Sequence, residues 1–363
     1  MYETSSDFGR TRVVGIVGGL LDRYMHTHYA LSLKMEDLLP LYLPLETYLL
    51  EDTLPALVLV PILWLKFEAP KFRINDDVWV EELSDDLLLA RSWHGRYGHS
   101  DNDLVESAAT HALFISGRSI ENYSWLDESI MQPESYPVET IDTFFAALRI
   151  ATDYPTGYAQ MLTLPLGWAS GYTANLPSLQ GPTVKNYPLS FDHGGWNDEV
   201  PTVSFGDAKV ITETFANLRD VSGTKHARKV GIAMHRLNLS AMRATEEDGV
   251  IDAMIAIEAL LSDGRQEMTH KIAMRLAALY KLVERSRATQ VFTEMKHIYN
   301  FRSQIVHGGA NLDKYRNIER GPAIVATVDA AVDYLRAAFA VLIKNPALLD
   351  PTRIDTFLLT DQL

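Results

Sequence analysis

The stretch EEDGVIDAMIAIEALLS, residues 246–262, decides the fold class of the second half of the chain. Its apolar side chains Val250, Met254, Ile257 and Leu261 recur at spacings of four, three and four residues. An α-helix repeats every 3.6 residues, so this spacing places them on one face. The stretch therefore predicts a helix that buries one face against other helices.

Further amphipathic stretches, joined by short polar connectors, predict helices on both sides of this one. They span residues 207–220, 225–244, 267–284, 288–309, 322–345 and 350–359. Pro322 and Pro351 stand at the predicted starts of the last two, because proline favours the first position of a helix. Short connections favour antiparallel neighbours, so we expect residues 207–363 to form an all-α antiparallel helical bundle.

Residues 1–163 predict an acidic α+β domain of a different character. The apolar run ALVLVPILWL, Ala56 to Leu65, is about half the length a bilayer needs, so it predicts a buried strand. Another strand is expected within residues 110–125, and a hairpin is expected to turn near Asn75. A helix is expected after these strands, with Thr140 as its N-terminal cap. Its apolar residues, at helical spacing, are Ile141, Phe144, Phe145 and Leu148.

Residues 164–206 are dense in Pro, Gly, Asn and aromatic residues, and they carry no long periodic run. This composition indicates either short strands with long loops or a connecting segment that closes over something.

Composition narrows the classes of function. The chain of 363 residues has no cysteine, which excludes disulfides, thiolate nucleophiles and Cys-ligated metals, and fits a reducing cytoplasm. Its first residues lack the order of a signal peptide. The net charge of −14 argues against a general nucleic-acid binder. Residues 204–363 carry 21 Lys and Arg against 19 Asp and Glu, so an anionic ligand is expected to prefer this half.

The stretch YNFRSQIVHGG, residues 299–309, places Arg302 and His307 near a predicted helix end. Five helical positions correspond to a rotation of roughly 140°, and Gly308 and Gly309 are expected to end the helix. Two interpretations stay open. The two cations can oppose the negative end of the helix, or they can line an interface cleft that receives an anion.

The segments VIDAMIAIEALLS, KIAMRLAALY and FRSQIVHGG, in this order, resemble the HEPN superfamily and its Apea-like branch, with Arg302 and His307 as the RxxxxH signature. The resemblance covers about residues 207–360. It implies a HEPN-like bundle that forms a homodimer, in which two RxxxxH helices share one cleft. It also implies a metal-independent endoribonuclease without a cofactor, of the kind found in antiviral defence and toxin systems, with RNA as substrate. The N-terminal domain would then sense a trigger or bind a regulatory partner.

The residue types suit RNA cleavage by the 2′-hydroxyl. His307 can serve as base or acid, because imidazole titrates near neutral pH. Arg302 can grip two phosphate oxygens and stabilise the phosphorane, and Ser303 can orient the phosphate. We expect no metal site, since no convincing carboxylate cluster is present.

Other residues are weaker candidates, each with a purely structural alternative. Glu258 is expected to accept a hydrogen bond from Arg302 or from another cation of the bundle in a buried structural pair, and a catalytic carboxylate is the second interpretation. Tyr299 can stack on a base or pack in the core. The possible substrate-binding cations, which can equally be solvated or paired surface residues, are Lys225, Arg228, Lys229, Arg316 and Arg320.

The main alternative to a ribonuclease is a non-catalytic HEPN module that dimerises or binds RNA. In that case the Arg302 and His307 pair only shapes an interface. An independent enzyme in the N-terminal half is a third possibility, but no constellation of residues there supports it.

Overall fold

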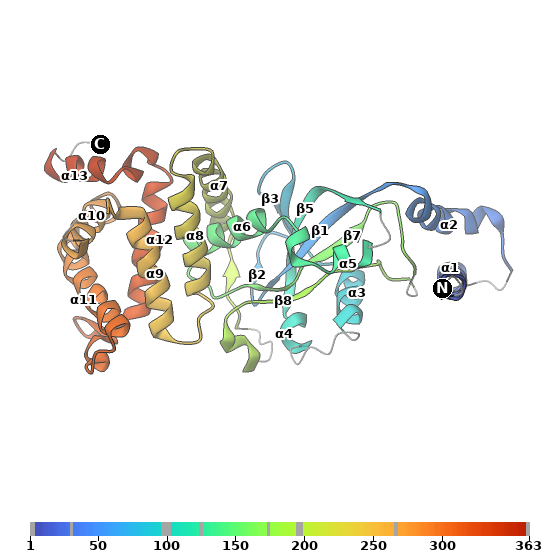
Figure 1. The fold of residues 1–363 in the computed structure, drawn as a ribbon, viewed down its shortest axis with the longest axis horizontal. Helices are drawn as coiled ribbons and strands as arrows, with labels where there is room; N and C mark the ends of the chain where they lie inside the picture. Colours follow the sequence, from blue (N-terminus) through green and yellow to red (C-terminus); the bar gives the residue numbers. More distant parts are fainter. Residues whose placement is uncertain are drawn as a thin grey trace. The chain divides into compact units, whose positions relative to one another are not determined.

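The computed structural model describes two compact units (Figure 1). The described residues are 4–29, 32–95, 103–122, 126–172, 175–193, 199–264 and 268–360. The first unit contains Met1–Val138, Tyr158–Lys185 and Gly195–Val200, and the second contains Glu139–Gly157, Asn186–Gly194 and Pro201–Leu363.

A five-stranded antiparallel sheet forms the centre of the first unit. Its strands, in spatial order, are β3 (Lys71–Arg73), β4 (Val78–Glu82), β5 (Ala109–Glu121), β1 (Thr53–Leu63) and β7 (Leu162–Pro165). The two long central strands are the apolar run at Ala56–Leu65 and the stretch at 110–125, so both predictions are confirmed. Their side chains are almost entirely buried in the middle of the sheet.

The predicted hairpin near Asn75 is also confirmed. Strands β3 and β4 pair antiparallel across residues 74–77. The Asn75 side-chain oxygen accepts hydrogen bonds from the backbone N–H groups of Asp77 (2.9 Å) and Val78 (2.8 Å). Asparagine is favoured in turns for this reason.

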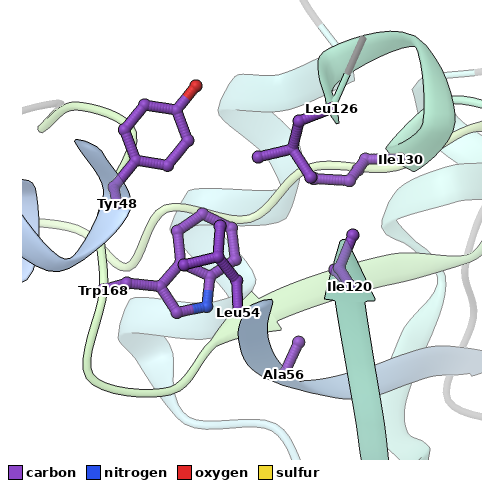
Figure 2. Packing of buried hydrophobic residues seen from close by; sticks show 7 residues of the cluster. All are labelled: Tyr48, Leu54, Ala56, Ile120, Leu126, Ile130 and Trp168. Carbon is purple, nitrogen blue, oxygen red and sulfur yellow. The ribbon is translucent and has the colours of Figure 1, made fainter. Parts of the chain in front are cut away.

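Helices and short strands complete the first unit. They are α1 (Thr4–His28), α2 (Met35–Leu50), β2 (Lys66–Phe67), α3 (Asp85–Gly95), α4 (Asp103–Ser107), α5 (Leu126–Ile130), the 3-10 turn η1 (Pro133–Ser135), β6 (Tyr158–Gln160) and β8 (Thr183–Asn186). Figure 2 shows one of its apolar clusters, in which Leu126 and Ile130 of α5 lie near Ile120 of β5. In the same cluster Tyr48 stacks on Trp168, with ring centroids 5.8 Å apart.

The second unit is rich in helices. They are α6 (Val138–Ala151), η2 (Leu189–His193), α7 (Phe205–Ser222), α8 (Ala227–Ser240), α9 (Glu246–Leu261), α10 (Met268–Val283), η3 (Arg285–Arg287), α11 (Ala288–His307), η4 (Leu312–Tyr315), α12 (Thr327–Leu342), η5 (Pro346–Leu349) and α13 (Pro351–Thr360); a short strand, β9 (Thr202–Val203), precedes α7. Helix α9 contacts α8, α10, α11 and α12, so it lies at the centre of this packing. The predicted apolar face of α9 is fully buried.

Two helices begin a few residues before their predicted starts. Helix α7 begins at Phe205, because Ser204 and Asp207 form a capping box that satisfies the first backbone N–H groups. Helix α6 begins at Val138, so Thr140 lies inside the helix and is not its cap. The prediction of Thr140 as a cap was therefore wrong.

The second unit also departs from a purely helical fold after α11. Residues predicted to begin a helix at Pro322 form instead the hairpin of β10 (Asn317–Arg320) and β11 (Ala323–Ala326). Gly321 turns the hairpin with a positive φ of 61°, and the β-branched Ile324 and Val325 suit a strand. Helix α12 begins only at Thr327, so the all-α prediction was wrong here.

Among the described residues, no helix combines the length and the apolar character needed to cross a bilayer.

Candidate functional site

The end of helix α11 is built as the sequence predicts. The helix ends at His307, and Gly308 follows with the left-handed φ of 65°. The Gly309 N–H donates to the Gln304 carbonyl (2.8 Å), and the Gly308 N–H donates to the Ile305 carbonyl (3.4 Å). This pair of bonds is a Schellman motif, which fixes where the backbone leaves the helix. His307 therefore projects from a defined helix end.

Replacing Gly308 by alanine is expected to lower the free energy of unfolding by about 1 kcal/mol, because a Cβ disfavours the left-handed conformation. Urea unfolding followed by circular dichroism measures this. The matched control is Gly231→Ala in the interior of α8, where a Cβ meets nothing within 4 Å. That substitution is expected to stabilise the chain by about 0.5–1 kcal/mol. The same sign for both variants would contradict this reading of the helix end.

Arg302 is half-buried on α11, and its guanidinium forms no hydrogen bond with another described residue. Its Nε atom is buried and has no hydrogen-bond partner, and no ion pair among the described residues includes it. The guanidinium lies 5.9 Å from the ring centroid of Tyr299, one turn earlier. A buried donor without a partner is costly, so this nitrogen is an unsatisfied position in the packing of α11.

Glu258 of α9 interacts electrostatically with Arg302. Burial raises the pKa of Glu258, and the positive charge of Arg302 opposes that rise. The buried Oε1 atom of Glu258 has no hydrogen-bond partner. The predicted hydrogen bond from Arg302 to Glu258 is therefore absent from the described structure, although the two charges interact. The Nε atom of Arg302 and the Oε1 atom of Glu258 are therefore both buried without a hydrogen bond.

Ser303 and His307 also lack a polar partner among the described residues. Ser303 is half-buried and His307 is exposed, and no hydrogen bond within the described part of the chain includes either side chain. Arg302 faces the packed side of α11, whereas His307 belongs to the exposed stripe that also contains Lys296 and Asn300. The roughly 140° between positions 302 and 307 keeps the two groups apart within one chain.

The two arginines after α11 are held by carboxylates. Arg316 donates to Glu246 (3.2 Å), to Asp313 (3.2 Å) and to Glu247. These contacts tie the segment after α11 to the start of α9. A guanidinium that shares three carboxylates has little net charge left for a phosphate.

Arg320 belongs to a second, more buried network. It donates to the Glu294 carboxylate through Nη2 (2.8 Å) and Nε (3.2 Å). Tyr334 and Gln290 donate to the same carboxylate, which is only 6% exposed. Arg320 thus joins the hairpin to α11 and α12, which favours the structural alternative for this residue.

The three basic residues around the start of α8, Lys225, Arg228 and Lys229, differ in their environments. The Nζ atom of Lys229 donates to the Leu260 carbonyl (3.3 Å) and to the Leu349 carbonyl. Burial lowers the pKa of Lys229, and Asp350 opposes this effect. Lys225 and Arg228 are exposed, so they remain free to meet a ligand.

Among the described residues, no group of three or more His, Asp or Glu side chains lies close enough together to hold a metal ion. The chain matches no protein-family model, no curated protein and no solved structure. The function therefore has to be inferred from the residues and their geometry.

Proposed function

We propose that the chain is a HEPN-type endoribonuclease that cleaves RNA without a metal, at a composite site formed by two copies of α11. The observation that carries the proposal is that, within the described part of the chain, neither Arg302 nor His307 forms a hydrogen bond or an ion pair, whereas Arg316 and Arg320 are paired with carboxylates. A half-buried cation without an ion pair is costly to keep, and a phosphate can compensate it.

The chemistry assigns one role to each residue. His307 removes the proton from the ribose 2′-hydroxyl, whose oxygen then attacks the phosphorus. The bond to the 5′-oxygen breaks, and an imidazole returns a proton to this leaving group. Arg302 stabilises the charge on the phosphorane, and Ser303 orients a phosphate oxygen. The products are a 2′,3′-cyclic phosphate and a 5′-hydroxyl end.

A second copy resolves the separation of the two groups. Within one chain, the helix geometry turns Arg302 and His307 away from each other. Two α11 helices facing each other across a two-fold axis bring an arginine of one copy beside a histidine of the other. The half-buried Arg302 and the exposed His307, which form no ion pair within the described residues, support this arrangement, since a second copy and its substrate can supply their partners.

The acidic N-terminal region is proposed to regulate the site. Residues 1–203 carry 28 Asp and Glu against 12 Lys and Arg, whereas residues 204–363 carry a small positive excess. A strongly negative region disfavours the approach of RNA by electrostatic repulsion. A trigger or regulatory partner that binds this region can remove that repulsion.

Cleavage of bulk RNA and of tRNA in the presence of EDTA tests the proposal. We expect products with 2′,3′-cyclic phosphate and 5′-hydroxyl ends. The variant Arg302→Met is expected to cleave about 10²–10³-fold more slowly, because it loses the group that stabilises the transition state. RNA binding without cleavage by the wild-type chain would reject the enzyme and favour the non-catalytic binding module.

A further inference from the structure

A pocket of about 340 Å³ opens in the first unit beside the end of β5. This volume falls in the range of small-molecule sites, about 300–1,000 Å³. The pocket combines one guanidinium, one carboxylate, three hydroxyls and two apolar side chains. Its lining residues are Arg118, Ser119, Ile120, Glu121, Leu126, Ser129 and Ser135.

Neutral groups hold the guanidinium of Arg118 at the pocket wall. Its Nη1 atom donates to the Thr163 hydroxyl (2.9 Å), and its Nη2 atom donates to the Ser135 hydroxyl (3.0 Å). The guanidinium also lies 4.1 Å from the ring centroid of Tyr136. No ion pair within the described part of the chain includes Arg118. Its positive charge is fixed in place but not neutralised.

Tyr136, on whose ring the Arg118 guanidinium lies, is itself held by hydrogen bonds. Tyr136 is only 4% exposed, and its hydroxyl lies within hydrogen-bonding distance of the Ile130 carbonyl (2.9 Å) and the Thr163 hydroxyl (3.0 Å). Arg118 uses two of its five N–H donors in the contacts with Thr163 and Ser135. A cation positioned in this way loses little entropy when an anion binds.

A β-bulge precedes Arg118 directly. Between the pairs Ala56–Arg118 and Val58–Ile115, strand β5 contains one residue more than β1. Gly117 adopts a positive φ of 79° there, although a Cβ at this position would meet nothing within 4 Å. The glycine is therefore needed for its backbone conformation. Bulges of this type re-aim the side chain that follows and recur beside binding sites.

The apolar part of the pocket is equally well supported. Ile120 and Leu126 are 5% and 3% exposed and belong to the cluster with Ile130 shown in Figure 2. They give the pocket an apolar wall next to its polar groups. The carboxylate of Glu121 then offers a hydrogen-bond acceptor to a hydroxyl or amino group of a ligand.

We propose that this pocket binds a small metabolite that carries a phosphate or carboxylate group against Arg118 and a hydroxyl or amino group facing Glu121. The hydroxyls of Ser119 and Ser129 donate to the anionic group, and the short apolar portion of the ligand packs on Ile120 and Leu126. All of these residues lie in the first unit, so the inference does not depend on RNA cleavage.

Isothermal titration calorimetry of the full chain tests the proposal with three probes. Inorganic phosphate and acetate report on the two possible anionic groups, and adenosine 5′-monophosphate joins a phosphate to hydroxyls. We expect saturable binding of at least one probe, weakened about 10- to 100-fold in Arg118→Met, because a hydrogen-bonded charge is lost. Comparison of phosphate with acetate identifies the anionic group.

Two further variants keep the test decisive. Ser119→Glu leaves the partners of Arg118 intact and adds a carboxylate at the exposed edge of the pocket, so it is expected to weaken binding by a similar factor even if Arg118→Met is poorly folded. The matched control Arg73→Met removes an exposed cation from β3 and is expected to leave binding unchanged. Absence of binding by all three probes at millimolar concentration, or equal affinity in all variants, would overturn the proposal.

Discussion

Replacing His307 by alanine is expected to slow RNA cleavage by about 10²–10⁴-fold, the usual contribution of a positioned general acid or base. The chain should nevertheless stay folded. His307 is exposed and forms no hydrogen bond or ion pair with another described residue, so its removal should change the free energy of unfolding by less than about 0.5 kcal/mol. Cleavage rates of labelled RNA at saturating enzyme, together with thermal unfolding, measure both effects.

The matched control is His270→Ala. His270 is also exposed, and it lies in the first turn of α10, away from the helix end that contains Arg302. It should lose no activity. If His307→Ala cleaves RNA at the wild-type rate, or if His270→Ala loses as much activity as His307→Ala, the catalytic assignment fails.

Replacing Glu294 by alanine is expected to produce the largest loss of stability, about 3 kcal/mol. The substitution leaves the largely buried guanidinium of Arg320, whose side chain is 20% exposed, without its carboxylate. It also leaves the buried hydroxyl of Tyr334 without its acceptor. Urea unfolding of the full chain measures the loss.

A double variant separates the ion pair from simple packing. Glu294→Leu combined with Arg320→Met removes both charges and keeps most of the volume, so we expect it to recover more than half of the lost stability. Glu319→Ala, at an exposed position of β10, serves as the control and should change little. If Glu294→Ala and Glu319→Ala unfold at the same urea concentration, Glu294 does not organise this part of the fold.

The pH dependence has a defined sign. Burial alone would raise the pKa of Glu294, but the hydrogen bonds from Arg320, Tyr334 and Gln290 outweigh it and lower this pKa below the ordinary value of 4.5. The folded state therefore favours the ionised carboxylate. Its stabilising effect is present above about pH 4.5 and is lost as the pH falls through the lowered pKa. Glu294→Ala should flatten the acid limb of the stability curve.

Periodicity predicted the regular elements because it depends only on which side chains are buried. The apolar spacing in α9 and the long runs in β1 and β5 are examples. It failed where local backbone chemistry decides the outcome. The stretch from Pro322 to Ala326 has a helix-start proline, yet the positive φ at Gly321 and the pairing with β10 make it a strand.

The candidate site was predictable in part. The helix end at His307 followed from the two glycines. The partners of Arg316 and Arg320 could not be predicted from the sequence. Glu246, Glu247 and Glu294 are distant from these arginines in sequence and approach them only through packing. Glu294 does carry a signal, since an acid between the apolar Val291 and Met295 indicates a paired, buried carboxylate.

The pocket in the first unit was missed for a similar reason. Its sequence signal is Gly117 followed by Arg118 in the middle of a strand, where an isolated glycine indicates a bulge. The hydroxyl partners of Arg118 lie at positions 135 and 163, and the sequence alone does not bring them together.

The rate of RNA cleavage per chain, measured in EDTA over a range of protein concentrations and compared with the dimer fraction from sedimentation, tests the shared site most directly. We predict that the rate follows the dimer fraction and that Arg302→Met and His307→Ala form dimers that cleave RNA at least about 10²-fold more slowly. Full cleavage by the monomer, or a dimer of the wild-type chain that leaves RNA intact, would contradict the account.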